Sequence, residues 1–201
     1  IEIDSEGFIY VADWNRIQKF DSFGNFITKW YCYAYSIAID KDDFLYVIGS
    51  NNVQKFDKNG NFILSWGSYG SGDGQFNSPK GLAVSKDGYV YVADTRNNRI
   101  HKFDLQGNFI KKWGSFGYGD GQFYSPYKIT CDDEGFLFVV DSGNNRIQKF
   151  DLEGNFIKKW GGGGYDDGQF SSPTDIKIDS IGYLYVIDED KDDLQIFDRD
   201  G

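Results

Sequence analysis

The chain has 201 residues, with 18 Phe, 14 Tyr, 5 Trp and 25 Gly but only 3 Pro, and its formal net charge is −10. A single-sign surplus of that size repels phosphate backbones and argues against a broad nucleic-acid footprint. Two cysteines are too few for a disulfide framework, and no apolar run approaches the roughly 20 residues of a membrane span. With no Met and no signal-peptide pattern, the chain is expected to be a segment or mature domain of something longer.

A four-part sequence marker recurs along the chain. Its first part is a Phe-Asp pair, which begins at Phe20, Phe56, Phe103, Phe150 and Phe197, at spacings of 36, 47, 47 and 47. A Gly follows three residues after each Asp, and the first four copies continue as Gly-Asn-Phe-Ile and reach a Trp. Self-similarity at a fixed period of this length is the signature of a repeat architecture.

Each repeat predicts four short antiparallel strands. In residues 80–113 the strands are expected at Lys80–Val84, Tyr89–Ala93, Arg99–Phe103 and Asn108–Trp113, joined by tight turns, two of which end in Gly. The repeats are expected at about residues 1–31, 32–67, 79–114, 126–161 and 173–201, and the last stops before its fourth strand. The connection from the first repeat to the second is much shorter than the others.

Both faces of each predicted sheet carry apolar side chains. Ile100 and Phe103 are three residues apart in one strand, so they point to opposite faces. Radial stacking of the copies around an axis would bury both faces. We therefore predict an all-β fold, a β-propeller of four-stranded antiparallel blades with five repeats, the last lacking its outer strand. The recurrent Trp residues are interpreted as packing between blades.

The most regular copies are YVADTRNNRIHKFDLQGNFIKKWG (residues 91–114) and FVVDSGNNRIQKFDLEGNFIKKWG (residues 138–161), and they closely resemble the NHL repeat. The loop before the next inner strand also fits the NHL pattern. It has the form Asp-Gly-Gln-Phe-x-Ser-Pro and occurs at 73–79, 120–126 and 167–173. The resemblance implies a propeller, typically six-bladed, that is most often a binding module and less often a lyase, a lactonase-like enzyme or an RNA binder. We accordingly expect this segment to belong to a six-bladed ring, and the resemblance leans toward an extracellular or cell-surface location.

An acid and a base recur at the hairpin between the second and third strands. The acids are Asp13, Asp94, Asp141 and Asp188, and the bases are Arg16, Arg99 and Arg146. The second repeat loses both and has Gly49 and Asn52 instead. Joint loss predicts an Asp–Arg pair that braces the hairpin. The Gly-rich segments 67–74, 114–121 and 161–168 precede strands rather than helices, so they are interpreted as flexible crossovers and not as phosphate cradles.

No catalytic constellation can be assembled from the sequence. The only histidine, His101, aligns with Gln at the same position of the other repeats and belongs to a strand on a blade face. One His cannot build the His cluster of a zinc enzyme. Acidic turns at Asp40–Asp43, Asp132–Glu134 and Asp190–Asp193 leave calcium open. The channel-facing positions are expected to be Glu2, Ala38, Ala83, Thr130 and Lys177, which make a poor cation site. No metal and no cofactor is predicted.

We therefore expect a non-enzymatic binding or scaffold module that uses one propeller face for a protein or glycan ligand. The alternatives are a calcium-dependent lactonase- or lyase-like enzyme with a site at the axis, and an RNA-binding NHL domain. Non-equivalent residues at the hairpin tips and at the starts of the inner strands predict the ligand patch, which consists of Trp14, Tyr35, Lys80, Arg96, Tyr127, Lys128 and Asp175.

Overall fold

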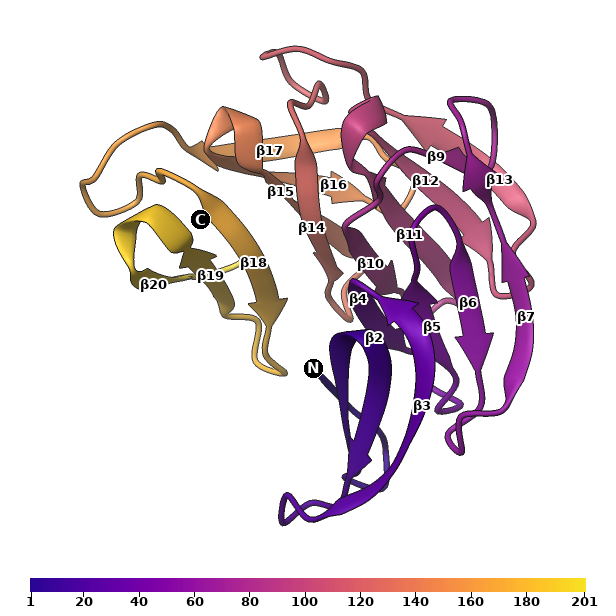
Figure 1. The fold of residues 1–201 in the computed structure, drawn as a ribbon. Coiled ribbons are helices and arrows are strands. Elements are labelled where there is room, and N and C mark those ends of the chain that lie inside the picture. The colour runs from indigo at the N-terminus through magenta and orange to yellow at the C-terminus, as the bar shows by residue number, and fades with distance from the viewer.

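The computed structural model describes residues 1–201 and arranges them as five antiparallel sheets around a central axis (Figure 1). The first strands of successive sheets lie side by side at the axis, and later strands lie progressively further out. The predicted all-β propeller is confirmed, with each sheet forming one blade. None of the short helices reaches the length and apolarity that crossing a membrane requires.

Blade 1 contains β1 (Glu2–Ile3), β2 (Ile9–Phe20) and β3 (Phe26–Ala34). Blade 2 contains β4 (Ser36–Ile39), β5 (Leu45–Ile48), β6 (Val53–Phe56) and β7 (Phe62–Trp66). Blade 3 contains β10 (Gly81–Val84), β11 (Tyr89–Asp94), β12 (Arg99–Asp104) and β13 (Phe109–Trp113). Blade 4 contains β14 (Pro126–Cys131), β15 (Phe136–Asp141), β16 (Arg146–Asp151) and β17 (Phe156–Gly161). Blade 5 contains β18 (Pro173–Ile178), β19 (Leu184–Asp188) and β20 (Asp193–Phe197), so it lacks the outer strand as predicted.

Short elements connect the blades and their strands. Between blades 2 and 3, β8 (Ser68–Tyr69) and β9 (Gln75–Phe76) form a small parallel pair. Single 3₁₀ turns lie between the second and third strands of blades 3, 4 and 5, as η1 (Thr95–Asn97), η2 (Ser142–Asn144) and η3 (Glu189–Lys191). Cys32 and Cys131 are free thiols.

Blade 1 departs from the repeat in two ways. Its element β2 folds back on itself at Trp14, whose φ is +47°, and therefore supplies both the second and the third strand (Figure 1). Its outer strand β3 continues to Ala34, where it pairs with Trp14, and so passes the expected boundary at residue 31. The extension replaces the missing loop, because β4 begins at Ser36, directly after β3.

The core is divided into layers between neighbouring blades. One layer joins blades 1 and 2 and includes Tyr10 and Val47, and another joins blades 3 and 4 and includes Ile100 and Phe150. Phe103 faces the opposite way, toward blade 2. The two faces of β12 thus pack on different neighbours, as the three-residue spacing predicts.

Each outer-strand Trp packs on a glycine of the following blade, which confirms the predicted packing role. The pairs are Trp30 with Gly60, Trp66 with Gly107, Trp113 with Gly154 and Trp160 with Gly201. At each of these glycines φ lies between +79° and +85°, and an added Cβ would collide with the indole ring. Glycine is therefore required for two reasons: the turn needs a positive φ, and the indole ring leaves no room for a Cβ.

Substitution of Gly60 by Ala is expected to destabilise the protein by more than the same change at Gly24. Both residues have left-handed φ values, +85° and +83°, so both variants incur about 1–2 kcal/mol of backbone strain. A Cβ at Gly60 would also lie 2.6 Å from the Trp30 ring, whereas nothing lies within 4 Å of a Cβ at Gly24. Displacing Trp30 should add about 1–3 kcal/mol, measurable by urea unfolding. Equal losses at the two sites would contradict this packing role.

Candidate functional site

Two hollows with shared lining residues lie along the propeller axis. One of about 230 Å³ is lined by all five positions predicted to face the channel, which are Glu2, Ala38, Ala83, Thr130 and Lys177. A second, of about 200 Å³, lies toward the starts of the inner strands, and its lining includes Tyr35, Lys128 and Asp175. The predicted channel is thus confirmed, and three of the predicted ligand residues line its mouth.

Trp14, Tyr35 and Lys80 form one continuous stack beside this mouth. The rings of Trp14 and Tyr35 meet edge to face with centroids 5.9 Å apart, and the Lys80 Nζ lies 4.3 Å from the centre of the Tyr35 ring. Trp14 remains 72 % exposed. A cation over an aromatic face is an attractive contact, so Lys80 holds Tyr35 while leaving the Trp14 ring open to solvent.

Charged groups line the cavity between these strands. The Nζ of Lys128 lies 3.4 Å from the Ser36 hydroxyl, and burial lowers the pKa of this lysine. Lys177 reaches across to pair with Glu2. The Asp175 carboxylate accepts the backbone N–H of the next residue at 2.9 Å. The mouth therefore offers both charge signs beside apolar side chains.

Arg96 and Tyr127 do not line this cavity. Arg96 lies exposed in η1, where its backbone N–H donates to the Asn77 carbonyl. Tyr127 is half-buried in β14, and its backbone lies against Gly81. Neither residue is among those that line the cavity, so their part in a ligand patch stays a prediction.

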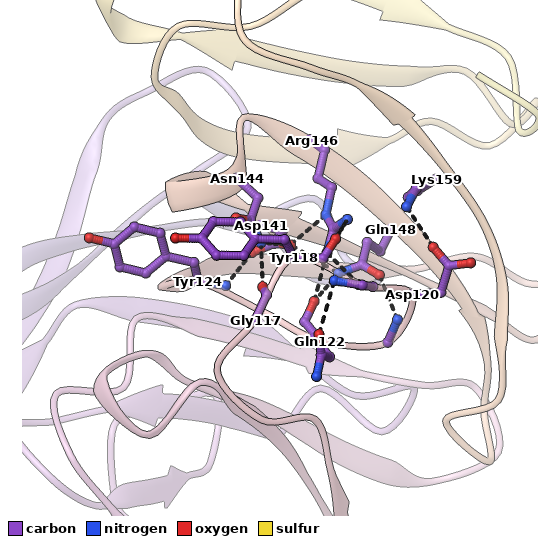
Figure 2. Close-up of polar contacts among 12 residues, drawn as sticks. Gly117, Tyr118, Asp120, Gln122, Tyr124, Asp141, Asn144, Arg146, Gln148 and Lys159 are labelled. Carbon is purple, nitrogen blue, oxygen red and sulfur yellow. Dashed lines mark hydrogen bonds and ion pairs between the residues drawn. The ribbon is translucent and has the colours of Figure 1, made fainter.

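The predicted Asp–Arg pairs exist, and their function is broader than bracing a hairpin. Arg146 donates from Nε to Asp141 at 2.7 Å, and its terminal nitrogens donate at 2.8 Å to the carbonyls of Tyr118, Gly119 and Gln122 (Figure 2). The Arg99 guanidinium binds Asp94 and the loop before blade 3 in the same way. The arginine is therefore a clamp on the loop that precedes its own blade.

The clamp explains why blade 2 loses both residues at once. Blade 2 follows blade 1 without an intervening Asp-Gly-Gln-Phe loop, so an arginine there would have no loop carbonyls to bind. Blade 5 has its loop but carries Asp193 at the arginine position, and there Lys191 donates to the carbonyls of Asp166 and Gln169. The prediction of flexible crossovers is wrong for these segments, because the buried cation and the aspartate fix them in place.

The family comparison agrees with this repeated loop and hairpin. Residues 76–103, which run from the loop through the clamp to the Phe-Asp marker, match the family model for the NHL repeat. Within this β-propeller, the matched segment is an NHL repeat. No curated protein sequence matches it.

Solved structures share the propeller fold at low sequence identity. The chain aligns with hydrazine synthase of Kuenenia stuttgartiensis (16% identity, 82% of this chain and 46% of that one, TM-score 0.63). It aligns with the Pan2 WD40 domain of Neurospora crassa (12%, 99% and 61%, TM-score 0.70) and with a streptogramin B lyase (15%, 98% and 66%, TM-score 0.68). The chain therefore spans less than half of the first of these proteins. The similarity to all three is one of fold.

A second aromatic cluster on the propeller was not predicted from the sequence. Phe116 meets Tyr118 and Tyr124 edge to face, with centroids 5.9 and 5.4 Å apart, and all three rings are exposed. Tyr124 fits because η2 carries Gly143, where a Cβ would lie 2.6 Å from the tyrosine ring. The sequence does contain one signal for this cluster. Tyr124 and Gly143 both differ from the residues at the equivalent positions of blade 3, which are Asn77 and Arg96.

The remaining candidate residues have internal partners. His101 is fully buried away from the channel, among Phe76, Phe103 and Phe109, as expected for a blade-face residue. No group of three or more His, Cys, Asp or Glu side chains converges as a metal site. In the acidic turn at 40–43, Asp40 accepts two backbone N–H groups and the Tyr46 hydroxyl. That carboxylate is used to close its own hairpin.

Proposed function

We propose that this propeller is a non-enzymatic binding module whose hairpin face contacts a protein or glycan ligand. The contact surface comprises the stack of Trp14, Tyr35 and Lys80, with Lys128 and Asp175 in the adjoining cavity mouth. The observation that carries the proposal is the state of Trp14. It combines a left-handed backbone, with φ of +47°, and an indole that is 72 % exposed.

The fold-back of β2 requires a left-handed residue at position 14, but it does not require a tryptophan there. A bulky residue at positive φ is a genuine outlier, and Asn or Gly would occupy that conformation at lower cost. An exposed indole also leaves a large apolar surface in water. Tryptophan is prominent among the residues that dominate binding energy at interfaces. A strained, exposed Trp beside a cavity mouth is therefore best explained by contact with a ligand.

The variant Trp14→Asn is expected to separate binding from folding. Asn tolerates the left-handed conformation, so the free energy of unfolding should stay the same or rise by up to about 1 kcal/mol. Ligands found by screening oligosaccharide and peptide panels against the native chain should bind the variant at least about tenfold more weakly.

The matched control is Phe23→Ser, because Phe23 is another highly exposed aromatic but lies in the turn at the opposite end of blade 1. This change should leave affinity unaltered. Unchanged affinity in Trp14→Asn, together with a loss of stability, would instead make Trp14 a structural cover for the junction between blades 1 and 2.

An enzyme site at the axis is the second candidate. Burial lowers the pKa of Lys128 inside the cavity, and a lysine shifted in this way is a candidate general base. The streptogramin B lyase is an enzyme with the same fold. We favour binding because Ile37, Leu82, Ile129 and Ile176 make up much of the rest of the cavity lining. Net charge and the clamped arginines disfavour the RNA alternative.

A further inference from the structure

One position near the start of the inner strand differs in each of blades 2 to 5. It holds Ser36, Gly81, Lys128 and Asp175, so these blades offer a hydroxyl, no side chain, an ammonium and a carboxylate. Ser36, Lys128 and Asp175 line the cavity of about 200 Å³ at the starts of these strands. A position that changes in every copy is not set by the repeat, so its residues are free to serve a ligand.

Lys128 reaches across this cavity. Its Nζ lies 3.4 Å from the hydroxyl of Ser36, although the two residues belong to blades 4 and 2. Blade 3, between them, has Gly81, where a Cβ would lie 2.7 Å from the Tyr127 carbonyl oxygen and 2.8 Å from the Lys128 Cα. The glycine therefore allows the inner strands of blades 3 and 4 to approach closely, and it places no side chain beside the lysine.

The Lys128 nitrogen has no anionic partner. It forms no ion pair, and the Ser36 hydroxyl is its single hydrogen-bond partner in the chain. The nearby acids have other partners, because Asp175 accepts the backbone N–H of the next residue and Glu2 pairs with Lys177. Charged side chains that leave water are normally paired. This nitrogen is therefore available to a ligand in the cavity.

The surroundings of Lys128 favour its neutral amine. Burial lowers the pKa of this lysine, and the charges of Lys177 and Lys80 lower it further, whereas Asp175 and Glu2 oppose the change. The neutral amine has a nitrogen lone pair, and a desolvated lysine beside another cation is an activated nucleophile toward carbonyl groups. Lys128 therefore combines a position in a cavity with the protonation state that attack on a carbonyl requires.

Lys55 shows that burial alone does not make such a nitrogen. Burial also lowers the pKa of Lys55, but its Nζ lies 3.8 Å from the Asp40 carboxylate and 3.5 Å from the Leu105 carbonyl. Two aromatic rings lie against the same ammonium. Lys55 is thus committed to the contact between blades 2 and 3, whereas Lys128 lines an open cavity.

We propose that Lys128 captures a small neutral hydroxyaldehyde reversibly, as an imine in the axial cavity. The ammonium first releases a proton to solvent, and the nitrogen lone pair then attacks the aldehyde carbon to form a carbinolamine. The two hydrogens of the amine leave with the carbonyl oxygen as water, and a C=N bond remains. Nothing is oxidised or reduced, and water reverses the step. The capture rests on the cavity alone and not on ligand contact at Trp14.

The cavity selects the chemical class of the aldehyde. When Lys128 is neutral, the charged side chains in the lining are Glu2, Asp175 and Lys177, so one negative charge is in excess. This excess disfavours an anionic carbonyl compound such as an oxo acid. The Asp175 carboxylate and the Ser36 hydroxyl accept hydrogen bonds from hydroxyl groups. The volume is below that of pockets for drug-sized ligands, so it suits a short carbon chain.

The test is reductive trapping on the native chain. Glyceraldehyde with sodium cyanoborohydride at pH 7 converts an imine into a stable secondary amine, and peptide mapping by mass spectrometry locates that amine. The reference is Lys29, an exposed lysine whose side chain forms no hydrogen bond or ion pair and contacts only the Tyr31 ring. We expect Lys128 to be labelled at least about five times faster than Lys29.

The charge selection is tested with glyoxylate, an aldehyde that carries a carboxylate. The ratio of Lys128 to Lys29 labelling should be at least about fivefold lower with glyoxylate than with glyceraldehyde. The variant Asp175→Asn removes one carboxylate and keeps the size of the side chain, so it should raise the glyoxylate ratio at least about threefold. Lys128→Arg keeps the positive charge and should remove the fast phase of labelling of the whole chain.

Three results would overturn the proposal. Labelling of Lys128 no faster than that of Lys29 would show an amine that is protonated or covered in solution. Equal ratios for the two aldehydes would contradict a neutral ligand. A fast phase that persists in Lys128→Arg would assign the reaction to another amine. None of these measurements uses a ligand from the oligosaccharide and peptide panels, so capture at Lys128 and binding at Trp14 can fail separately.

Discussion

Replacement of Arg146 by Met is expected to lower the free energy of unfolding by about 3–5 kcal/mol. The change leaves the fully buried Asp141 carboxylate without its cation and removes the donors to three loop carbonyls. A buried charge that loses its partner costs far more than the net strength of the pair, because its desolvation is no longer compensated. Urea unfolding at pH 7 measures the loss.

The chain contains its own control for this prediction. Arg16 and Asp13 form the same ion pair at 2.7 Å, but both side chains are substantially exposed and no loop carbonyl joins them. Solvent screening reduces such a pair to about 1 kcal/mol or less. Arg16→Met should therefore cost little. If the two variants lost equal stability, the loop clamp would not be the source of the effect.

The propeller could be predicted because its information is local and repeated. The spacing between Phe20 and Phe197 defines the repeat, and glycine-terminated turns define the hairpins within it. The loop clamp could not be predicted in the same way. The sequence shows that blade 2 replaces both members of the Asp–Arg pair, with Gly49 and Asn52. It does not show that the guanidinium of Arg146 also reaches carbonyls 24 to 28 residues earlier. A backbone carbonyl is present at every residue, so a contact with one leaves no recognisable pattern in the sequence.

The candidate site also contains residues that the repeat pattern predicts and residues that it does not. Tyr35, Lys128 and Asp175 could be predicted to lie near one another because the starts of inner strands converge on the axis, and the structure places all three in the lining of one cavity. The cluster around Phe116 could not be predicted, because it depends on contact between a loop and η2 of the following blade. Its one visible trace is that Tyr124 and Gly143 depart together from the repeat, and only the three-dimensional contact shows why.

His101 should make the protein sensitive to acid. Its ring is fully buried among aromatic side chains, neither ring nitrogen has a hydrogen-bond partner, and burial lowers its pKa to about 3. The charges of Arg99 and Lys112 add to this lowering, and Asp73 opposes it. The unfolded chain takes up a proton below about pH 6.5, whereas the folded chain resists it. Stability is therefore present above pH 6.5 and is lost as the pH falls toward 3, by about 3 kcal/mol between pH 7 and pH 4.

The variant His101→Gln should remove this loss. Blade 4 has Gln148 at the same position, where its amide donates to the Gln122 carbonyl at 2.7 Å and accepts the Gly121 N–H at 3.0 Å. Gln at position 101 can make the equivalent bonds to the loop before blade 3, so stability at pH 7 should rise by about 1–2 kcal/mol.

Unfolding free energies at pH 7 and pH 4 measure both effects, and His101→Phe serves as the control. Phe keeps the aromatic packing and removes the titrating group, but it cannot bind the loop. Both variants should therefore lose the acid sensitivity, and only Gln should gain the stability at pH 7. If the native chain and His101→Gln lost equal stability between these pH values, the acid sensitivity would belong to other groups, and the burial of this ring would have no titration consequence.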